Sequence, residues 1–162
     1  MSSAVLLNPD YTTERMLKTL RLLRNEYHFG GYIHAKAIPG TSPELLEQLG
    51  FLADRLSVNA ELPSENSLKL LAPDKGRHSI FRPMKQIAVS GAASREELTL
   101  YRHAPKFAPA GQSTQMIVGA SPETDYNILK LTEGMYQKYR LKRVYCSAFI
   151  PVTEDTGDRA LG

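Results

Sequence analysis

Cysteine is nearly absent from the sequence: among 162 residues, Cys146 is the only one. A single thiol excludes a disulfide within the chain and any metal or cluster site built from several cysteines of this chain. The histidines His34, His78 and His103 have no spacing typical of metal ligands. A Walker loop, a dinucleotide glycine fingerprint and a serine nucleophile elbow are also lacking. The sequence therefore predicts no metal site formed by its own residues.

Long apolar runs are lacking as well. Near the N-terminus the only such run is Ala4-Val5-Leu6-Leu7, and no basic residues precede it. This run is too short for a signal peptide and far too short to cross a bilayer. The net charge of +3 is compatible with an acidic partner without requiring one. We therefore expect a cytoplasmic globular protein that does not bind membranes.

Short apolar segments alternate with longer segments of helical periodicity. The pattern predicts strands at residues 32–38, 55–59, 114–118 and 144–150. Strands that alternate with helices indicate an α/β fold with a parallel sheet under helices. The last predicted strand is apolar on both faces, which favours burial under helices. The pattern does not separate a β/α barrel from an open doubly wound sheet, or from a small complete α/β domain.

Polar residues that can cap a helix stand before each helical segment: Asp10 or Thr12, Ser42, Ser64 and Ser121. Gly50 is expected to end the second helix. The segment 80–100 is expected to break at Pro83 and Gly91. Ser94 and Glu97 have the spacing of a capping box, which predicts a second short helix there.

Candidate site residues follow the predicted strands, where both architectures bind their ligands. Asn59 and Glu61 are two residues apart, so in an extended chain their side chains point the same way. An amide beside a carboxylate suits two neighbouring hydroxyls, as on a ribose. Alternatively, Asn59 caps a turn and Glu61 lies in solvent. Gly119 either lets a flat ligand approach the backbone or only serves a turn.

Lys36 is the one charge inside its otherwise apolar strand. A buried lysine can form a Schiff base if desolvation lowers its pKa, which would fit a barrel lyase. Lys36 could equally bind an anion or lie at a solvated edge. Cys146 lies within a strand, where a small buried hydrophobic role is commoner than a nucleophilic one.

Together, five segments resemble one known family: NPDYTTERM, GYIHAKAIPGTSPELLEQLG, ADRLSVNAELPSENSLKLLAPDK, QSTQMIVGASPETDYNIL and VYCSAFIPV. The family is the radical S-adenosylmethionine (radical SAM) proteins described as DNA modification or repair proteins, which are related to biotin synthase-like enzymes. The resemblance runs in order over nearly the whole chain. It implies a radical SAM-type β/α barrel with parallel strands and outer helices.

The resemblance also implies two cofactors, S-adenosylmethionine and a [4Fe–4S] cluster, and a reductant protein as partner. The cluster would be held by a CxxxCxxC loop, its electron would cleave S-adenosylmethionine, and the substrate would be DNA or nucleotide-like. No CxxxCxxC is present. We therefore expect residues 1–152 to be a partial core of about strands two to six, lacking the first strands and inactive alone. Residues 153–162 would begin a link to a C-terminal region.

Four residues carried over from the family lie in the first half of the chain. Ser2 and Ser3 would close the preceding strand, at the turn that meets the methionine amino group. Asn59 and Glu61 would contact the ribose of S-adenosylmethionine. Lys36 would face the barrel interior on the substrate side.

The family's fifth-strand GxIxG pattern falls on residues 115–119, with Gln115 in place of the first glycine. It implies that Ile117 packs on the adenine and that Gly119 admits the backbone approach. Tyr145 and Ser147 would lie at the adenine edge. Glu123 stands one position beyond the motif's glutamate, so the resemblance gives it no role.

Two other functions compete with a radical SAM enzyme. One is a non-catalytic β/α domain that keeps part of an adenosyl-binding surface. The other is the lysine-dependent barrel lyase that uses Lys36.

Overall fold

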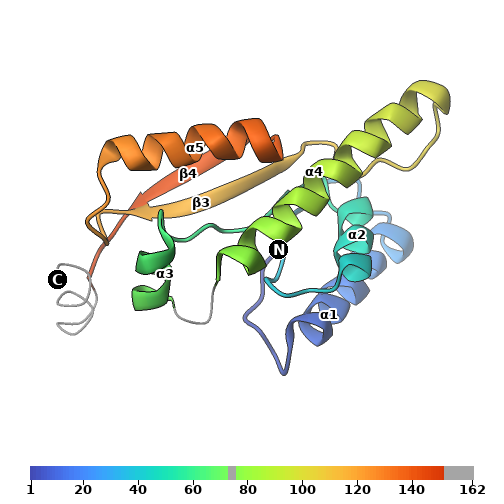
Figure 1. Cartoon of the computed structure of the whole chain (residues 1–162). Helices are drawn as coiled ribbons and strands as arrows, with labels where there is room; N and C mark the ends of the chain where they lie inside the picture. The colour runs from blue at the N-terminus through green and yellow to red at the C-terminus, as the bar shows by residue number, and fades with distance from the viewer. Residues whose placement is uncertain (73–75, 152–162) are drawn as a thin grey trace.

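The computed structural model describes residues 1–72 and 76–151 (Figure 1). Its elements are α1 (Pro9–Arg21), the π-helical turn η1 (Leu22–Glu26), β1 (His34–Lys36), α2 (Pro43–Leu52), β2 (Arg55–Ser57), α3 (Glu65–Leu71), α4 (Arg77–Leu100), β3 (Gln112–Val118), α5 (Asp125–Tyr139) and β4 (Arg143–Ala148). The expected link at residues 153–162 lies outside the described residues.

The strands form one four-stranded parallel sheet in the order β1-β2-β3-β4. Each strand therefore pairs with the next in sequence, and helices make the crossovers that parallel neighbours need. The helices pack beside one another in the same order, α1 on α2, α2 on α4 and α4 on α5. This confirms an α/β fold with a parallel sheet. The strand order does not reverse, as it would in a doubly wound sheet.

The first residue of the chain pairs with β1. The Met1 amino group donates to the carbonyl oxygen of His34, and the Lys36 N–H donates to the carbonyl oxygen of Met1 at 2.9 Å. A residue of a parallel neighbouring strand makes this pair of bonds. Met1 thus occupies the sheet position before β1, and the strand order still follows the chain.

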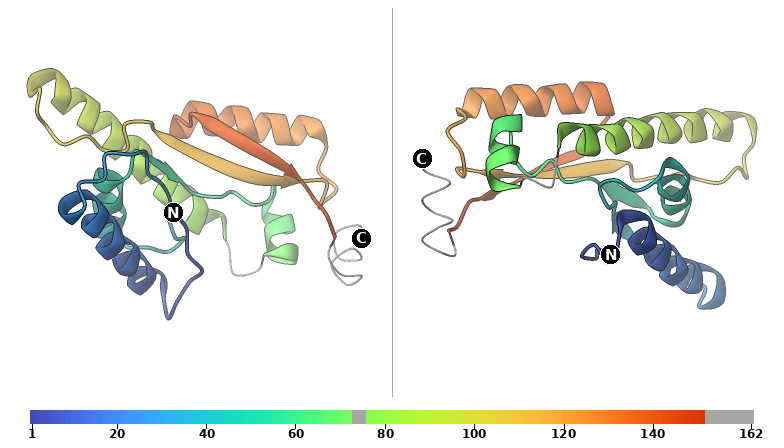
Figure 2. Two further views of the ribbon diagram at one scale, coloured as in Figure 1. Left: turned by 180° about the vertical axis from the view of Figure 1, so that it is seen from behind. Right: turned by 60° about the horizontal axis from the view of Figure 1, so that its bottom comes forward.

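The two faces of the sheet differ in chemistry. Strand side chains under the helices are mainly apolar and buried, including Ala35, Leu56, Val58 and Met116. The strand register and the alternation of side chains place the other set on the opposite face. This set, here called the polar sheet face, is polar except for one residue: His34, Lys36, Arg55, Ser57, Ser113, Gln115, Ile117, Arg143, Tyr145 and Ser147. Seen from this side, β3 and β4 lie in front of α4 and α5 (Figure 2, left).

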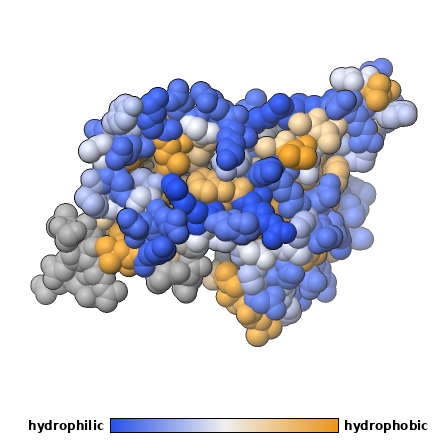
Figure 3. All heavy atoms as spheres, viewed as in Figure 1, coloured by the Kyte–Doolittle hydropathy of each residue, from blue (hydrophilic) through white to orange (hydrophobic). Residues whose placement is uncertain are grey.

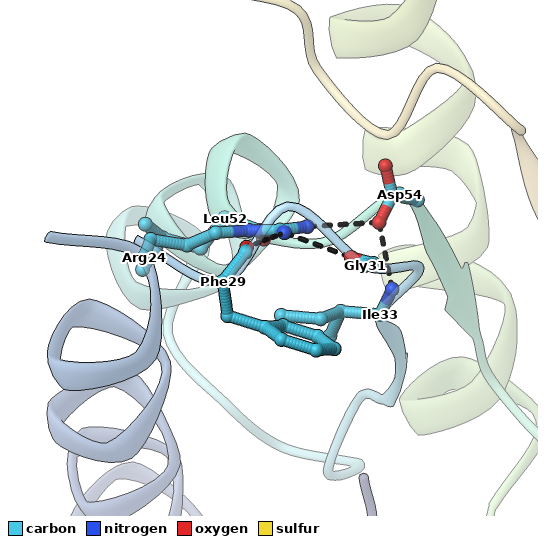
Figure 4. A network of polar contacts seen from close by, with 6 residues as sticks. All are labelled: Arg24, Phe29, Gly31, Ile33, Leu52 and Asp54. Atoms are coloured by element: carbon cyan, nitrogen blue, oxygen red, sulfur yellow. Dashed lines mark hydrogen bonds and ion pairs between the residues drawn. The ribbon is translucent and has the colours of Figure 1, made fainter. Parts of the chain in front are cut away.

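Arg24 fastens the end of the first helical region to the starts of β1 and β2 (Figure 4). Its guanidinium donates to the carbonyl oxygens of Phe29, Gly31 and Leu52 at 2.6, 2.9 and 3.2 Å. It also pairs with Asp54 Oδ2 at 2.8 Å, and the same oxygen accepts from the Ile33 N–H at 2.7 Å. The Arg24 side chain therefore holds the loop before β1 in place.

Helix caps agree with the sequence at α2 and α3 and differ at α1 and α5: Ser42 and Ser64 stand at the expected N-caps, whereas Asn8 and Thr124 replace the expected residues. At α1, Asn8 Oδ1 accepts from the Tyr11 N–H at 2.8 Å. Asp10, an expected cap, instead accepts from the Ser42 N–H at 2.6 Å. The hydroxyl of Thr12 bonds the loop before the helix. The cap predictions Asp10, Thr12 and Ser121 were therefore wrong, and at α1 both expected caps lie inside the helix, where other partners take their polar groups.

The expected break in segment 80–100 was also wrong, because α4 is continuous. Burial of apolar side chains such as Met84 offsets the helix hydrogen bond lost at Pro83. The Ser94 hydroxyl accepts from the Phe107 N–H at 3.0 Å and so anchors the following loop instead of capping a helix. Gly91 also lies near the Phe107 ring: an added Cβ would meet it at 3.9 Å.

Strand β4 is more exposed than its apolar sequence indicates. Within residues 1–72 and 76–151 it pairs on one side only, with β3. Most of its side chains are exposed, and so is the thiol-bearing Cys146. The predictions that this strand is buried under helices and that Cys146 is a buried hydrophobe were therefore wrong.

Figure 3 shows that the visible helical side is largely hydrophilic, as helices facing water usually are. An apolar area at the bottom of that view lies over the chain segment that enters α1 (Figures 1 and 3). In this segment Val5, Leu6 and Leu7 are 55, 52 and 87% exposed.

Candidate functional site

A cavity of about 260 Å³ opens at the carboxyl edge of the sheet, where β2, β3 and β4 end. It is lined by Glu61, Leu62, Leu71, Ala72, Ile117, Ala120 and Phe149. Two expected site residues, Glu61 and Ile117, therefore meet in one cavity. Its wall is apolar apart from the Glu61 carboxylate, a combination that suits a flat ring carrying hydroxyl groups.

The backbone of Glu61 is held against β3. Its N–H donates to the Gln115 carbonyl at 3.0 Å, and its own carbonyl accepts from the Ile117 N–H at 2.7 Å. Its φ of +64° is left-handed, a conformation that a non-glycine residue keeps only when its surroundings fix it. The extended chain assumed for Asn59 and Glu61 therefore ends before Glu61. Their spacing does not place them on one face; the bonds to β3 position Glu61.

Gly119 follows β3 with a φ of +84°, which favours glycine. No atom lies within 4 Å of the position that a Cβ would take there. The turn thus accounts for the glycine, and the space beside its backbone is open. The two expectations for Gly119 are compatible.

Tyr145 and Ser147 lie at different positions along β4. Ser147 pairs with Ile117, and its hydroxyl accepts from Gln115 Nε2 at 3.2 Å. Tyr145 is two residues nearer the amino end, where its oxygen accepts from Arg55 Nη1 at 3.3 Å and Arg143 Nη1 at 3.5 Å. These hydrogen bonds, from Arg143 first and Arg55 second, lower the pKa of Tyr145. Tyr145 is thus grouped with two arginines and does not line the cavity beside Glu61.

The remaining expected residues also lie outside that cavity. Lys36 ends β1 on the polar sheet face, in register with Ser57, and is half-buried. Ser2 and Ser3 are exposed, and the Ser3 hydroxyl donates to the neighbouring Ala4 carbonyl at 2.8 Å. The structure therefore brings together only part of the expected set.

Sequence reasoning missed Glu123, which lines a second hollow of about 400 Å³ between the start of α3 and the turn after β3. The hydroxyl of Ser67 donates to its carboxylate. Burial raises the pKa of Glu123, but hydrogen bonds from Ser121, Ser64 and Ser67 outweigh it and lower that pKa to about 2. Glu123 thus fastens α3 to the turn as a carboxylate. Ser64 and Ser67 lie more than fifty positions earlier in the chain, so no local motif indicates this contact.

Among residues 1–72 and 76–151, no three His, Cys, Asp or Glu side chains are grouped so as to hold a metal ion. No helix in the same ranges is long and apolar enough to cross a bilayer. No protein-family model matches the chain, and no curated protein matches it either.

Proposed function

We propose that this chain is part of a radical SAM-type β/α barrel and supplies the surface that binds the adenosyl group of S-adenosylmethionine. Three features support the proposal: the five resembling segments, a parallel sheet whose strands pair in chain order, and helices packed in that same order. Consecutive pairing of parallel strands is the pairing found in a β/α barrel. The observation that carries the proposal is the cavity between Glu61, Ile117 and Phe149 at the carboxyl edge.

In this proposal the adenine packs between the apolar side chains of Ile117 and Phe149. The Glu61 carboxylate accepts hydrogen bonds from the ribose hydroxyls, and Asn59, half-buried just upstream, adds a polar group at the same strand end. The open backbone at Gly119 admits the edge of the nucleoside. A cavity of about 260 Å³ is just below the usual range of pockets for small molecules, roughly 300–1,000 Å³, which favours an adenosine-sized group.

The described residues do not fit an iron–sulfur cluster. Such clusters take several cysteine thiolates, whereas Cys146 is the only cysteine of the sequence and lies exposed on β4. We therefore derive no step through a cluster. The part assigned to this chain is to bind and orient the adenosyl group.

The test is titration of the full chain with S-adenosylmethionine by calorimetry, in wild type and Glu61→Gln. Glutamine keeps the size of the side chain but removes a charge-assisted hydrogen bond, worth about 1.5–3 kcal/mol. Affinity should fall about tenfold or more. Glu65→Gln is the matched control, because Glu65 is exposed on the first turn of α3 and should have little effect.

Equal affinity of wild type and Glu61→Gln would refute the ribose contact, and absence of binding to the wild type would refute the site. 5′-Deoxyadenosine in place of S-adenosylmethionine should show the same ratio between the variants, since it keeps the ribose hydroxyls. Borohydride trapping of a carbonyl compound on Lys36 would favour the lyase instead.

A further inference from the structure

A cavity of about 400 Å³ lies at the amino edge of the sheet, where the start of β3 and the end of α5 meet beside α4 (Figure 1). It shares no lining residue with the cavity beside Glu61, which lies at the carboxyl edge. Its volume falls within the usual range for small-molecule pockets, roughly 300–1,000 Å³. It is also many times the share of one water molecule, about 30 Å³. The space can therefore hold an organic molecule.

The inner wall of this cavity is apolar. It is formed in part by Ile87 on α4, Phe107 in the loop before β3 and Leu141 in the turn before β4, and all three side chains are buried. A wall of this kind favours a ring or an aliphatic chain over a fully hydrated ion.

One polar atom among the lining residues has no partner. Gln112 is 2% exposed, and its Nε2 donates to the carbonyl oxygens of Met84 and Tyr139 at 2.9 and 2.5 Å. These two bonds fix which atom of the amide is the oxygen, because the reverse orientation would place it against both carbonyls. Oε1 is buried and accepts no hydrogen bond within the described structure. Since a buried acceptor without a donor is costly, this atom favours a ligand that carries an N–H or O–H group.

Three cations surround the mouth of the cavity. They are Arg95 on α4, and Arg140 and Lys142 on either side of Leu141, and all three are exposed. None of the lining residues is acidic, and in residues 1–72 and 76–151 no carboxylate forms an ion pair with any of the three. The mouth therefore has positive charge that suits an anionic group.

Two glycines in the lining leave the space in which two of these cations lie. Arg95 Nη1 is 3.5 Å from the position that a Cβ would take at Gly91, and Lys142 Cγ is 2.7 Å from that position at Gly111. Gly111 also has a φ of +78°, which favours glycine. The Arg95 guanidinium and the Lys142 stem therefore lie against the lining of the cavity.

We propose that this cavity binds a small organic anion. The oxyanion of the ligand, a carboxylate or a phosphate, accepts hydrogen bonds from Arg95, Arg140 and Lys142. Its apolar body packs on Phe107, and an N–H or O–H at its other end donates to Gln112 Oε1. An inorganic ion has no apolar body, and a neutral compound leaves the three cations without a counterion. The site does not depend on the adenosyl cavity, with which it shares no residue.

The experiment is an NMR titration of the ¹⁵N-labelled full chain at constant ionic strength, with 4-hydroxyphenylacetate and with 4-hydroxyphenyl phosphate. Both probes carry an oxyanion, a ring and an O–H donor, and the tighter binder identifies the anionic group. We expect a dissociation constant of about 1 mM or lower, with shifts at the amides of Gly91 and Gly111. Failure of both probes to shift these amides would overturn the proposal.

Two simpler compounds test the two ends of the ligand. Phenylacetate lacks the O–H donor for Gln112 and should bind about fivefold more weakly than 4-hydroxyphenylacetate. The uncharged 4-hydroxyphenylethanol should bind about tenfold more weakly, because it lacks the oxyanion. Inorganic phosphate should not compete with either probe. Equal affinity of all the organic compounds, or full competition by inorganic phosphate, would overturn the assignment.

Variants of the cations separate binding from folding. Arg140 ends α5 with a φ of +52°, where glycine is the favoured residue, so Arg140→Gly should not lower the urea midpoint. Its affinity for the tighter probe should fall about fivefold, as should that of Arg95→Gln. Arg82→Gln is the control, because it removes the same charge from an exposed position of α4 outside the cavity. Unchanged affinity in the first two variants, or an equal loss in all three, would overturn the proposal.

Discussion

Two helical glycines offer a matched test of how closely the helices pack. Gly50 is buried in α2, and Gly134 is exposed in α5. A Cβ at Gly50 would lie 2.1 Å from Cε2 of Phe107, whereas a Cβ at Gly134 would meet no atom within 4 Å. Alanine gains about the same helix propensity at both sites, roughly 1 kcal/mol. Any difference between the two variants therefore reports the contact with Phe107.

The expected magnitudes follow from the surroundings of Phe107. Its ring is 3% exposed and packs edge-on against Phe51 at 5.4 Å between ring centres. Its backbone is also held by Ser94, so the ring has little room to withdraw. Overpacking a core costs about 1–3 kcal/mol, and a 2.1 Å approach requires a substantial shift. After the gain in propensity, Gly50→Ala should destabilise by about 1–2 kcal/mol and Gly134→Ala should stabilise by about 0.5–1 kcal/mol.

Urea unfolding followed by circular dichroism measures both effects as opposite shifts of the midpoint. The cost of Gly50→Ala should shrink in a Phe107→Leu background, because the smaller side chain leaves room for the methyl group. If Gly50→Ala stabilised the chain as much as Gly134→Ala does, the close packing of α2 on Phe107 would be refuted.

Two further predictions concern charged groups. Arg24→Gln should lower the free energy of unfolding by about 2–4 kcal/mol, because it removes charge-assisted hydrogen bonds to three carbonyls and to Asp54, all of them partly exposed groups. The control is Arg21→Gln at an exposed position, measured in the same urea series, which should change the free energy of unfolding by at most about 0.5 kcal/mol. For Glu123, whose pKa falls from an ordinary 4.5 to about 2, the stabilisation is complete above pH 4.5 and is lost as the pH falls toward 2. Glu123→Gln should flatten the acid limb of the stability curve in that window, and an unchanged limb would contradict the role assigned to this carboxylate.

Local patterns predicted the elements of the fold better than their ends. Each observed strand overlaps an expected segment, since apolar runs between helical segments are a local property. The errors arise where distant contacts decide. Asp10 lies inside α1, which begins at Pro9, and its carboxylate accepts from Ser42, 32 positions away, while Asn8 caps the helix. The hydroxyl of Ser94 is taken by the loop at Phe107, and packing of α4 keeps the helix whole through Pro83.

The candidate site shows the same limit. Glu61 and Ile117 do meet, but a left-handed residue bonded to β3 brings them together, and no spacing rule predicts it. The sequence predicted the strand that holds Tyr145, but it did not predict the position of Tyr145 relative to the cavity. Two residues along a strand are about 7 Å, which takes Tyr145 away from the cavity and toward Arg55. Arg55 was not selected because in the sequence it stands only beside Asp54. The fold brings it to the Tyr145 oxygen, to which Arg143 also donates.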